Sequence, residues 1–207
     1  MNATRLARWT AVTAGAAIFV GIAGAAVAEE QHGDEAVDVS VSIAQIDEPG
    51  VLAMSIAGTT TTLVENGSDA LVRQFTGSLP TVTVTDTRDP GDIPAGVGWY
   101  VLGSSSAFAG DAGQPAIGAD HLGWTPRLID GGDAGLVTEG DPVQTVLDTT
   151  APDPFGLVDQ ELFAMALDSA AIAAEGQWTA TADLTLRTPA DVAPGSYSGT
   201  VTLSLFE

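Results

Sequence analysis

The chain has no cysteine and no lysine among its 207 residues. Without cysteine the protein forms no disulfide bonds, so the packed core alone must stabilise the fold. The same absences exclude a cysteine nucleophile and a lysine Schiff base from any catalytic mechanism. Chemistry at a functional site must therefore come from carboxylates, hydroxyls, aromatic rings and a few arginines.

Positive charge is scarce as well, with six arginines against 27 Asp and Glu and a formal net charge of −21. Loss of an N-terminal segment that carries Arg5 and Arg8 leaves a charge of −23. A surface this acidic excludes nucleic acid as a partner, because phosphate binding needs a basic face. The acidity has two interpretations: solubility, which we favour, or a need for divalent cations or salt to relieve self-repulsion.

Histidine occurs only at His32 and His121, and His32 precedes the predicted domain. No Gly-Xaa-Ser-Xaa-Gly sequence, the nucleophile turn of many serine hydrolases, accompanies His121. One histidine is also too few for the usual catalytic zinc site. We interpret His121 as a structural loop residue and predict that the protein is not an enzyme. One alternative stays open, a secreted glycan hydrolase with loop carboxylates as acid and base.

Long apolar runs are missing beyond the first 28 residues. In that segment Arg5 and Arg8 precede an apolar stretch over 11–27, which ends in small residues at 26–28. This order is typical of a secretory signal peptide. We predict a signal helix over 1–28, a polar leader over 29–36, one domain over 37–207 and no membrane span after cleavage. The alternative is an uncleaved anchor, although the stretch is short and rich in glycine and alanine.

The domain consists of short segments in which apolar and polar residues alternate, which is the pattern of half-buried strands. Turn signals are closely spaced, and no segment has a convincing amphipathic helical pattern. We therefore predict an all-β fold, an antiparallel β-sandwich. The segment 99–102 is apolar on both faces and is predicted to be a central strand, whereas 131–156 is a long loop or a pair of short strands. The predicted strands are 37–43, 52–56, 59–64, 79–87, 99–102, 120–130, 162–167, 177–189 and 196–207. For 162–167 a helix that runs on into 170–174 is the alternative, but the strands on either side favour a strand.

The last two of these segments are predicted to pair as an antiparallel hairpin. Apolar residues occupy even positions in 177–189 and odd positions in 196–207. Opposite residues of an antiparallel pair share a face, so Leu186 is expected opposite Tyr197, and Trp178 opposite Leu205. A slip of one residue would expose each large apolar side chain at a cost of about 1.5–3 kcal/mol.

Acidic residues gather in two glycine-containing loops. Carboxylate oxygens are the ligands that Ca²⁺ prefers, so either loop is a candidate calcium site. Neither loop has the spacing of a known calcium-binding loop, and solvated charge is the simpler interpretation. We therefore predict no obligatory cofactor. The candidates are Asp86, Asp89 and Asp92 in the first loop, and Asp130 and Asp133 in the second.

Three tryptophans fall within the predicted domain. Trp178 is a core residue by its phase in the alternation, and Trp99 and Trp124 each follow a glycine on a predicted strand. Indole rings at such positions usually fill a core. The functional alternative is an exposed aromatic face that stacks on sugar rings.

Two stretches of this sequence resemble the WxL domain of Gram-positive cell-surface proteins. The first runs over 82–88 and through a glycine-rich loop to Gly-Trp-Tyr-Val at 98–101, and the second is 197–205. The family motif Trp-any-Leu is matched by Trp99, Tyr100 and Val101, with valine in place of leucine. The distal motif, Tyr, three residues, then Leu-Thr-Trp-any-Leu, is matched at Tyr197, Val201, Thr202 and Leu205, but Leu203 replaces its tryptophan. Residues 122–126 and 186–197 are also similar to actinobacterial members.

The resemblance covers most of 37–207 and implies a secreted protein held non-covalently at the cell wall. The implied partner is peptidoglycan or an associated polymer, with other surface proteins as further partners. Because an anionic wall repels so acidic a chain, we expect attachment to depend on divalent cations. A structural subunit of a surface assembly, built by strand addition at a sheet edge, is a second alternative to the hydrolase. The wall-contact candidates are Trp99, Tyr100, Val101, Trp124 and Tyr197.

Overall fold

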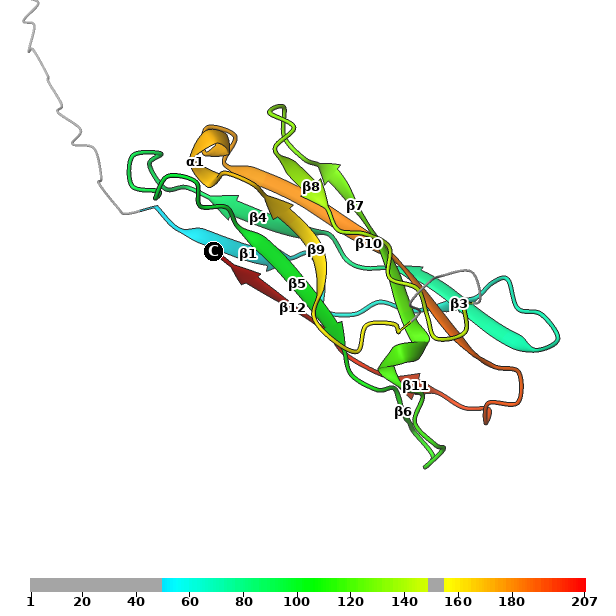
Figure 1. Cartoon of the computed structure of the whole chain (residues 1–207). Coiled ribbons are helices and arrows are strands. Elements are labelled where there is room, and N and C mark those ends of the chain that lie inside the picture. Colours follow the sequence, from blue (N-terminus) through cyan, green and yellow to red (C-terminus); the bar gives the residue numbers. More distant parts are fainter. Residues whose placement is uncertain (1–49, 149–154) are drawn as a thin grey trace, which may run out of the picture. The chain divides into compact units, whose positions relative to one another are not determined.

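The computed structural model describes residues 50–148 and 155–207, which form an all-β domain with antiparallel sheets (Figure 1). This confirms the predicted fold class at that level. The predicted signal helix, the leader and the strand 37–43 lie outside the described residues. None of the helices in the described ranges is long and apolar enough to cross a membrane. The strands are β1 (Leu52–Ile56), β2 (Val64–Glu65), β3 (Val72–Ser78), β4 (Val82–Asp86), β5 (Tyr100–Ser105), β6 (Ala109–Gly110), β7 (Leu122–Asp130), β8 (Val137–Glu139), β9 (Glu161–Ala166), β10 (Gln177–Pro189), β11 (Tyr197–Ser198) and β12 (Val201–Phe206).

The long strand β10 organises the larger sheet, which has six strands. On one side β10 pairs with β4 near its start and with β3 near its end, while β7 pairs along its other side. Strand β1 extends the sheet beyond β4, and β2 extends it beyond β3. A second sheet has the order β12-β5-β9-β8, and β11 pairs with β6 in a two-stranded ribbon.

The predicted terminal hairpin is wrong, because β10 and β12 belong to different sheets. Trp178 lies opposite Val84 of β4, and Leu205 lies opposite Val101 of β5. Alternation determines which face of a strand is buried, but many partner strands satisfy the same parity. The connection after β10 instead carries the chain into β11 and on to the second sheet (Figure 1).

Most other predicted strands are confirmed, and β5 is a central strand as predicted. Strand β3 was missed, because its sequence VRQFTGS has little apolar alternation. In the segment 59–64 only Val64 is in a strand, and in the described part of 131–156 the only strand is β8. After β9 comes a single helical turn, α1 (Ser169–Ile172), whose N-cap is Asp168; the carboxylate of Asp168 accepts a hydrogen bond from the Ala171 N–H.

The core lies between the six-stranded and four-stranded sheets and is built around tilted aromatic pairs. Trp99 packs on Trp178 with ring centroids 5.6 Å apart, and Trp124 packs on Phe163 at 5.5 Å. All four rings are at most 2% exposed. The prediction that Trp178 is a core residue is confirmed. Because one ring of each pair comes from each side of the core, these contacts join the layers.

Gly103 of β5 provides the space that one of these indoles occupies. A Cβ atom at this position would lie 2.5 Å from Cη2 of Trp124 and 2.7 Å from Cδ2 of Leu203. Both distances are far shorter than any carbon–carbon contact allows. The glycine is therefore required by close packing of side chains in the core rather than by an unusual backbone conformation.

We expect Gly103→Ala to lower the free energy of unfolding by about 1–3 kcal/mol, the usual cost of overpacking a core. Urea denaturation followed by tryptophan fluorescence measures this change. Gly58→Ala is the matched control, because a Cβ there would meet only Pro80 at 3.8 Å. Equal stability of Gly103→Ala and the wild-type protein would contradict the packing described for Trp124.

Candidate functional site

Three of the five predicted wall-contact residues are core residues. Trp99 and Trp124 are each 1% exposed, and Val101 is 0% exposed. Their side chains point between the sheets, where no polymer reaches them. The interpretation of Trp99 and Trp124 as core residues is therefore confirmed, and their predicted contact with the wall is wrong. Leu203, where the WxL motif has tryptophan, also packs against the core cluster. That departure from the motif therefore changes the core and not the surface.

Tyr197 is half-buried and lies apart from the other candidates in the ribbon formed by β11 and β6. Its hydroxyl donates a hydrogen bond to the carbonyl oxygen of Ala193 at 2.7 Å. Its ring packs against the core cluster. We interpret Tyr197 as a residue that fixes the connection between β10 and β11.

Tyr100 is the one predicted contact residue that presents a substantial aromatic surface to solvent. It stands between Trp99 and Val101, so alternation along β5 turns it away from the core. Its ring stacks on that of Phe206, with centroids 5.3 Å apart and planes 17° apart, and each residue is 37% exposed. Phe206 was not predicted. It follows Leu205 in the β12 alternation and so faces outward, but the predicted hairpin gave it no partner.

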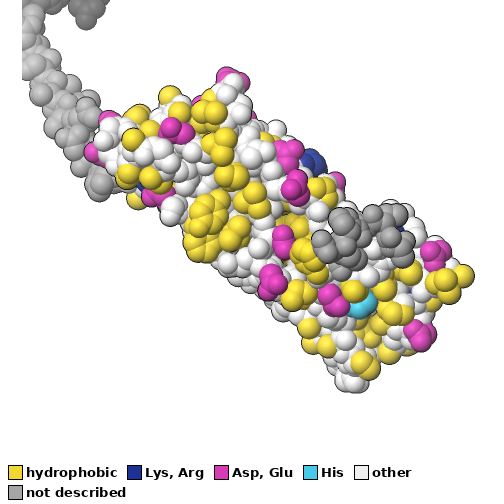
Figure 2. Space-filling view, in the orientation of Figure 1, with side chains coloured by type: hydrophobic (Ala, Val, Ile, Leu, Met, Phe, Trp, Pro, Cys, Tyr) yellow, Lys and Arg dark blue, Asp and Glu magenta, His cyan; other side chains and the backbone are white. Residues whose placement is uncertain are grey.

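The stacked pair belongs to a larger apolar area on the outer side of the four-stranded sheet. One cross-strand row runs from Phe206 through Tyr100 to Met165, and the next contains Leu102 and Leu162. None of these five residues is part of the core cluster or packs against it. We call them the aromatic face. Hydrophobic side chains gather over this region of the molecule in Figure 2.

The aromatic face carries almost no charge of its own, although the chain is very acidic. Strands β5 (YVLGSS) and β12 (VTLSLF) contain no charged residue. The other outward positions of these two strands are the hydroxyl residues Ser104, Thr202 and Ser204. The β5 and β12 part of the face is thus uncharged and combines two stacked rings with hydroxyl groups, while Glu161 precedes Leu162 on β9.

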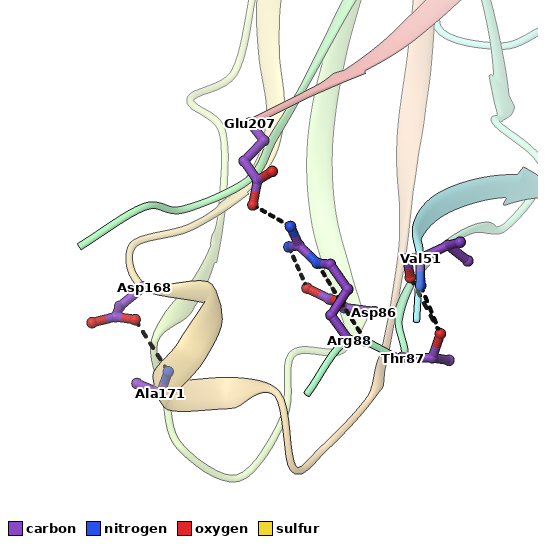
Figure 3. A network of polar contacts seen from close by, with 7 residues as sticks. All are labelled: Val51, Asp86, Thr87, Arg88, Asp168, Ala171 and Glu207. Carbon is purple, nitrogen blue, oxygen red and sulfur yellow. Dashed lines mark hydrogen bonds and ion pairs between the residues drawn. The ribbon is translucent and has the colours of Figure 1, made fainter. Parts of the chain in front are cut away.

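An ion-pair network holds the end of β12 beside this face (Figure 3). Arg88 binds both carboxylate oxygens of Asp86, at 2.8 Å through Nε and 2.7 Å through Nη2. Its Nη1 binds Oε1 of Glu207 at 2.6 Å. Because Asp86 ends β4 and Glu207 follows β12, the guanidinium joins the two sheets at one end. We call these three residues the clasp.

The clasp changes how its members titrate. Burial of Asp86 by itself raises the pKa of that carboxyl, but the hydrogen bonds and charge of Arg88 outweigh burial, so the pKa lies below its usual value. The pKa of Arg88 is raised, chiefly by its hydrogen bond to Asp86. The Asp86 carboxylate is therefore satisfied by Arg88, which argues against the calcium role predicted for it.

The remaining calcium candidates do not come together in the described part of the chain. Asp89 accepts a hydrogen bond from the Gly91 N–H at 2.8 Å, and Asp130 accepts one from the Gly132 N–H at 3.1 Å. Over residues 50–148 and 155–207, which contain Asp92 and Asp133, no group of three or more acidic or histidine side chains is placed to hold a metal ion. Calcium dependence stays a prediction without a located site.

The alternative hydrolase would need a pair of carboxylates as acid and base. Among the described residues, Glu161 is the carboxyl group whose pKa is raised, first by burial and then by the charge of Asp159. His121 contacts the backbone carbonyl oxygen of Arg187 through Nδ1, which fits the structural role predicted for it. The absence of catalysis remains a prediction.

We expect Arg88→Leu to lower the free energy of unfolding by about 3 kcal/mol, because it leaves the buried Asp86 carboxylate without its partner. Arg73→Leu is the matched control. It removes an exposed pair with Glu65, whose side chains are 35% and 42% accessible, and should cost much less. Urea denaturation at pH 7 compares the two. Equal losses would show that the clasp contributes no more than an ordinary surface pair.

The clasp should also make stability depend on pH in the acid range. Because the folded pKa of Asp86 is depressed, its stabilisation is fully present above the unfolded value of about 3.9 and is lost as pH falls through the folded value. Wild type should therefore be more stable than Asp86→Asn at pH 7, and the difference should shrink below about pH 4. Denaturation of both proteins between pH 2 and pH 7 measures it. A difference that stays constant with pH would exclude a titrating Asp86.

Comparison with protein-family models, with curated proteins and with solved structures finds no match to this chain. The WxL resemblance therefore stays a prediction that rests on the motifs of the sequence.

Proposed function

We propose that this chain is an exported, non-catalytic cell-surface domain that attaches non-covalently to the Gram-positive cell wall. The single observation that carries the proposal is the exposed stacked pair of Tyr100 and Phe206 within an uncharged face. Contiguous exposed apolar patches on a folded protein mark interaction surfaces. An aromatic ring with a flat apolar surface and a neighbouring hydroxyl suits a sugar ring, which also combines apolar C–H faces with hydroxyl groups.

We further propose that the domain is a β-sandwich of the WxL type. In this interpretation the motif Trp99-Tyr100-Val101 has two roles that alternate along one strand. Trp99 and Val101 hold the layers together, and Tyr100 contacts the wall glycan. The motif then describes a strand that is buried on one face and binds on the other.

The charge distribution supports attachment through this particular face. The mature chain would carry −23, and most of its surface would repel an anionic wall. A neutral glycan strand that approaches the uncharged strands β5 and β12 avoids the strongest local repulsion. Divalent cations would screen or bridge the remaining acidic surface, which is the basis for the expected chelator sensitivity.

A structural subunit of a surface assembly is the second candidate. It is favoured by the position of β12 and β1, which end the four-stranded and six-stranded sheets in the described domain. An unpaired strand edge is a template for strand addition from another chain. Sedimentation that depends on protein concentration would support this candidate, whereas wall attachment predicts a monomer that pellets only with sacculi.

We expect Tyr100→Ala and Phe206→Ala each to reduce the fraction of mature protein that pellets with purified wall sacculi, and the double variant to lose most of it. Phe155→Ala is the matched control, since Phe155 is a 47% exposed aromatic residue outside this face. Trp99→Ala should unfold the protein rather than weaken binding selectively. Full retention of the folded double variant would refute the aromatic face as the contact surface.

A chelator arm tests the proposed dependence on divalent cations. Retention of the wild type should fall when EDTA is added and return with excess Ca²⁺ or Mg²⁺. Raising NaCl in place of a divalent cation separates general screening from bridging. No retention under any of these conditions would reject wall attachment itself.

A further inference from the structure

A polar pocket of about 180 Å³ lies on the outer side of the six-stranded sheet. Its floor consists of strands β3, β10 and β7, which contribute Gln74, Thr185, Arg187 and Thr125. Strands β3 and β10 pair along this floor, and Gln74 of β3 lies directly opposite Arg187 of β10. Residues 143–148 pass over this floor and form the remaining wall.

The wall segment is held close to the sheet by contacts at both ends. Val143 exchanges two backbone hydrogen bonds with Trp124, at 3.0 and 2.9 Å. A Cβ atom at Gly123 would lie 2.4 Å from the Val143 carbonyl oxygen, so only glycine allows the segment to approach this closely. At the other end, Asp148 forms an ion pair with Arg187. The shape of the pocket is thus set by these specific contacts between the wall segment and the sheet, and not by loose packing.

The charged groups of the pocket neutralise each other. The guanidinium of Arg187 pairs with one carboxylate oxygen of Asp148 and donates to Gln74 Oε1 at 2.7 Å. The second carboxylate oxygen accepts hydrogen bonds from the N–H and the hydroxyl of Thr145, at 2.9 and 2.8 Å. An anion that entered the pocket would meet Asp148, and a cation would meet Arg187. The chemistry favours a neutral ligand.

Three uncharged side chains of the lining have hydrogen-bonding capacity to spare. Thr125 and Gln144 are exposed and Thr185 is half-buried, and none of the three side chains forms a hydrogen bond with another described residue. Together they offer both donors and acceptors. A volume near 180 Å³ suits one small ring with its substituents rather than an extended chain.

We propose that this pocket binds a single neutral sugar unit. Its hydroxyl groups would pair with Thr125, Gln144 and Thr185, while the ion pair of Arg187 and Asp148 keeps the cavity open and shaped. The pocket faces away from the core on the six-stranded sheet, whereas the aromatic face lies on the four-stranded sheet. The inference therefore does not depend on the proposed wall attachment, and either can fail alone.

Titration of the ¹⁵N-labelled full domain with N-acetylglucosamine, followed by amide chemical shifts, tests the proposal. Shifts that saturate and map to Gly123, Thr125, Gln144 and Thr185 are expected. Glucuronic acid, of similar size but charged, should bind more weakly to the same amides. No saturable shift, shifts confined to Tyr100 and Phe206, or tighter binding of glucuronic acid would each overturn the proposal.

Two hydroxyl deletions make the test specific. Thr125→Val and Thr185→Val keep side-chain shape and should each weaken N-acetylglucosamine binding by about three- to tenfold, the effect of losing one neutral hydrogen bond. Thr83→Val is the matched control, because Thr83 faces outward on β4 of the same sheet but does not line the pocket. Equal affinity in all three folded variants would place the sugar elsewhere, whatever the sacculus assay shows.

Discussion

The domain depends on tryptophan rings buried between two antiparallel sheets. Trp178 comes from the long strand β10, Trp99 directly precedes β5, and their rings meet at 5.6 Å between the layers. Burying rings of this size is among the largest stabilising contributions available to a chain without disulfides. This requirement fixes which side of each strand faces inward. Alternation then turns many of the neighbouring positions outward, among them Tyr100 on β5 and Thr185 and Arg187 on β10.

Alternation explains why local sequence predicted so much of the secondary structure and so little of the pairing. The inward phase of Trp178, Val82 and Val84 is visible in the sequence and is confirmed. Strand pairing is not local, since the even and odd pattern of β10 fits β3, β4 and β7 as well as it fits β12. A strand with little alternation, such as β3, gives no signal of its own, because pairing along β10 rather than a buried apolar face defines it.

The residues of the candidate sites were predictable only where local sequence was enough and strand pairing was not needed. Tyr100 was identified through a motif, but its role as the exposed member of that motif needed the buried neighbours on either side. Phe206 became part of the site only through the pairing of β12 with β5. The polar pocket joins Gln74, Thr125 and Thr185, which lie on three strands far apart in the sequence. No spacing rule brings such residues together before the register is known.

The two proposed surfaces both carry little net charge, although the chain as a whole is very acidic. In a chain with a net charge of −21, an uncharged area large enough to bind is uncommon, yet β5 and β12 carry no charged side chain. The pocket is neutral for a different reason, because Arg187, one of six arginines, pairs with Asp148 and balances its charge. Arg88 is used in the same way to neutralise Asp86 beside the end of β12. These scarce cations are thus placed where they cancel local negative charge. This neutral character is the basis for proposing uncharged glycans as the ligands of both surfaces.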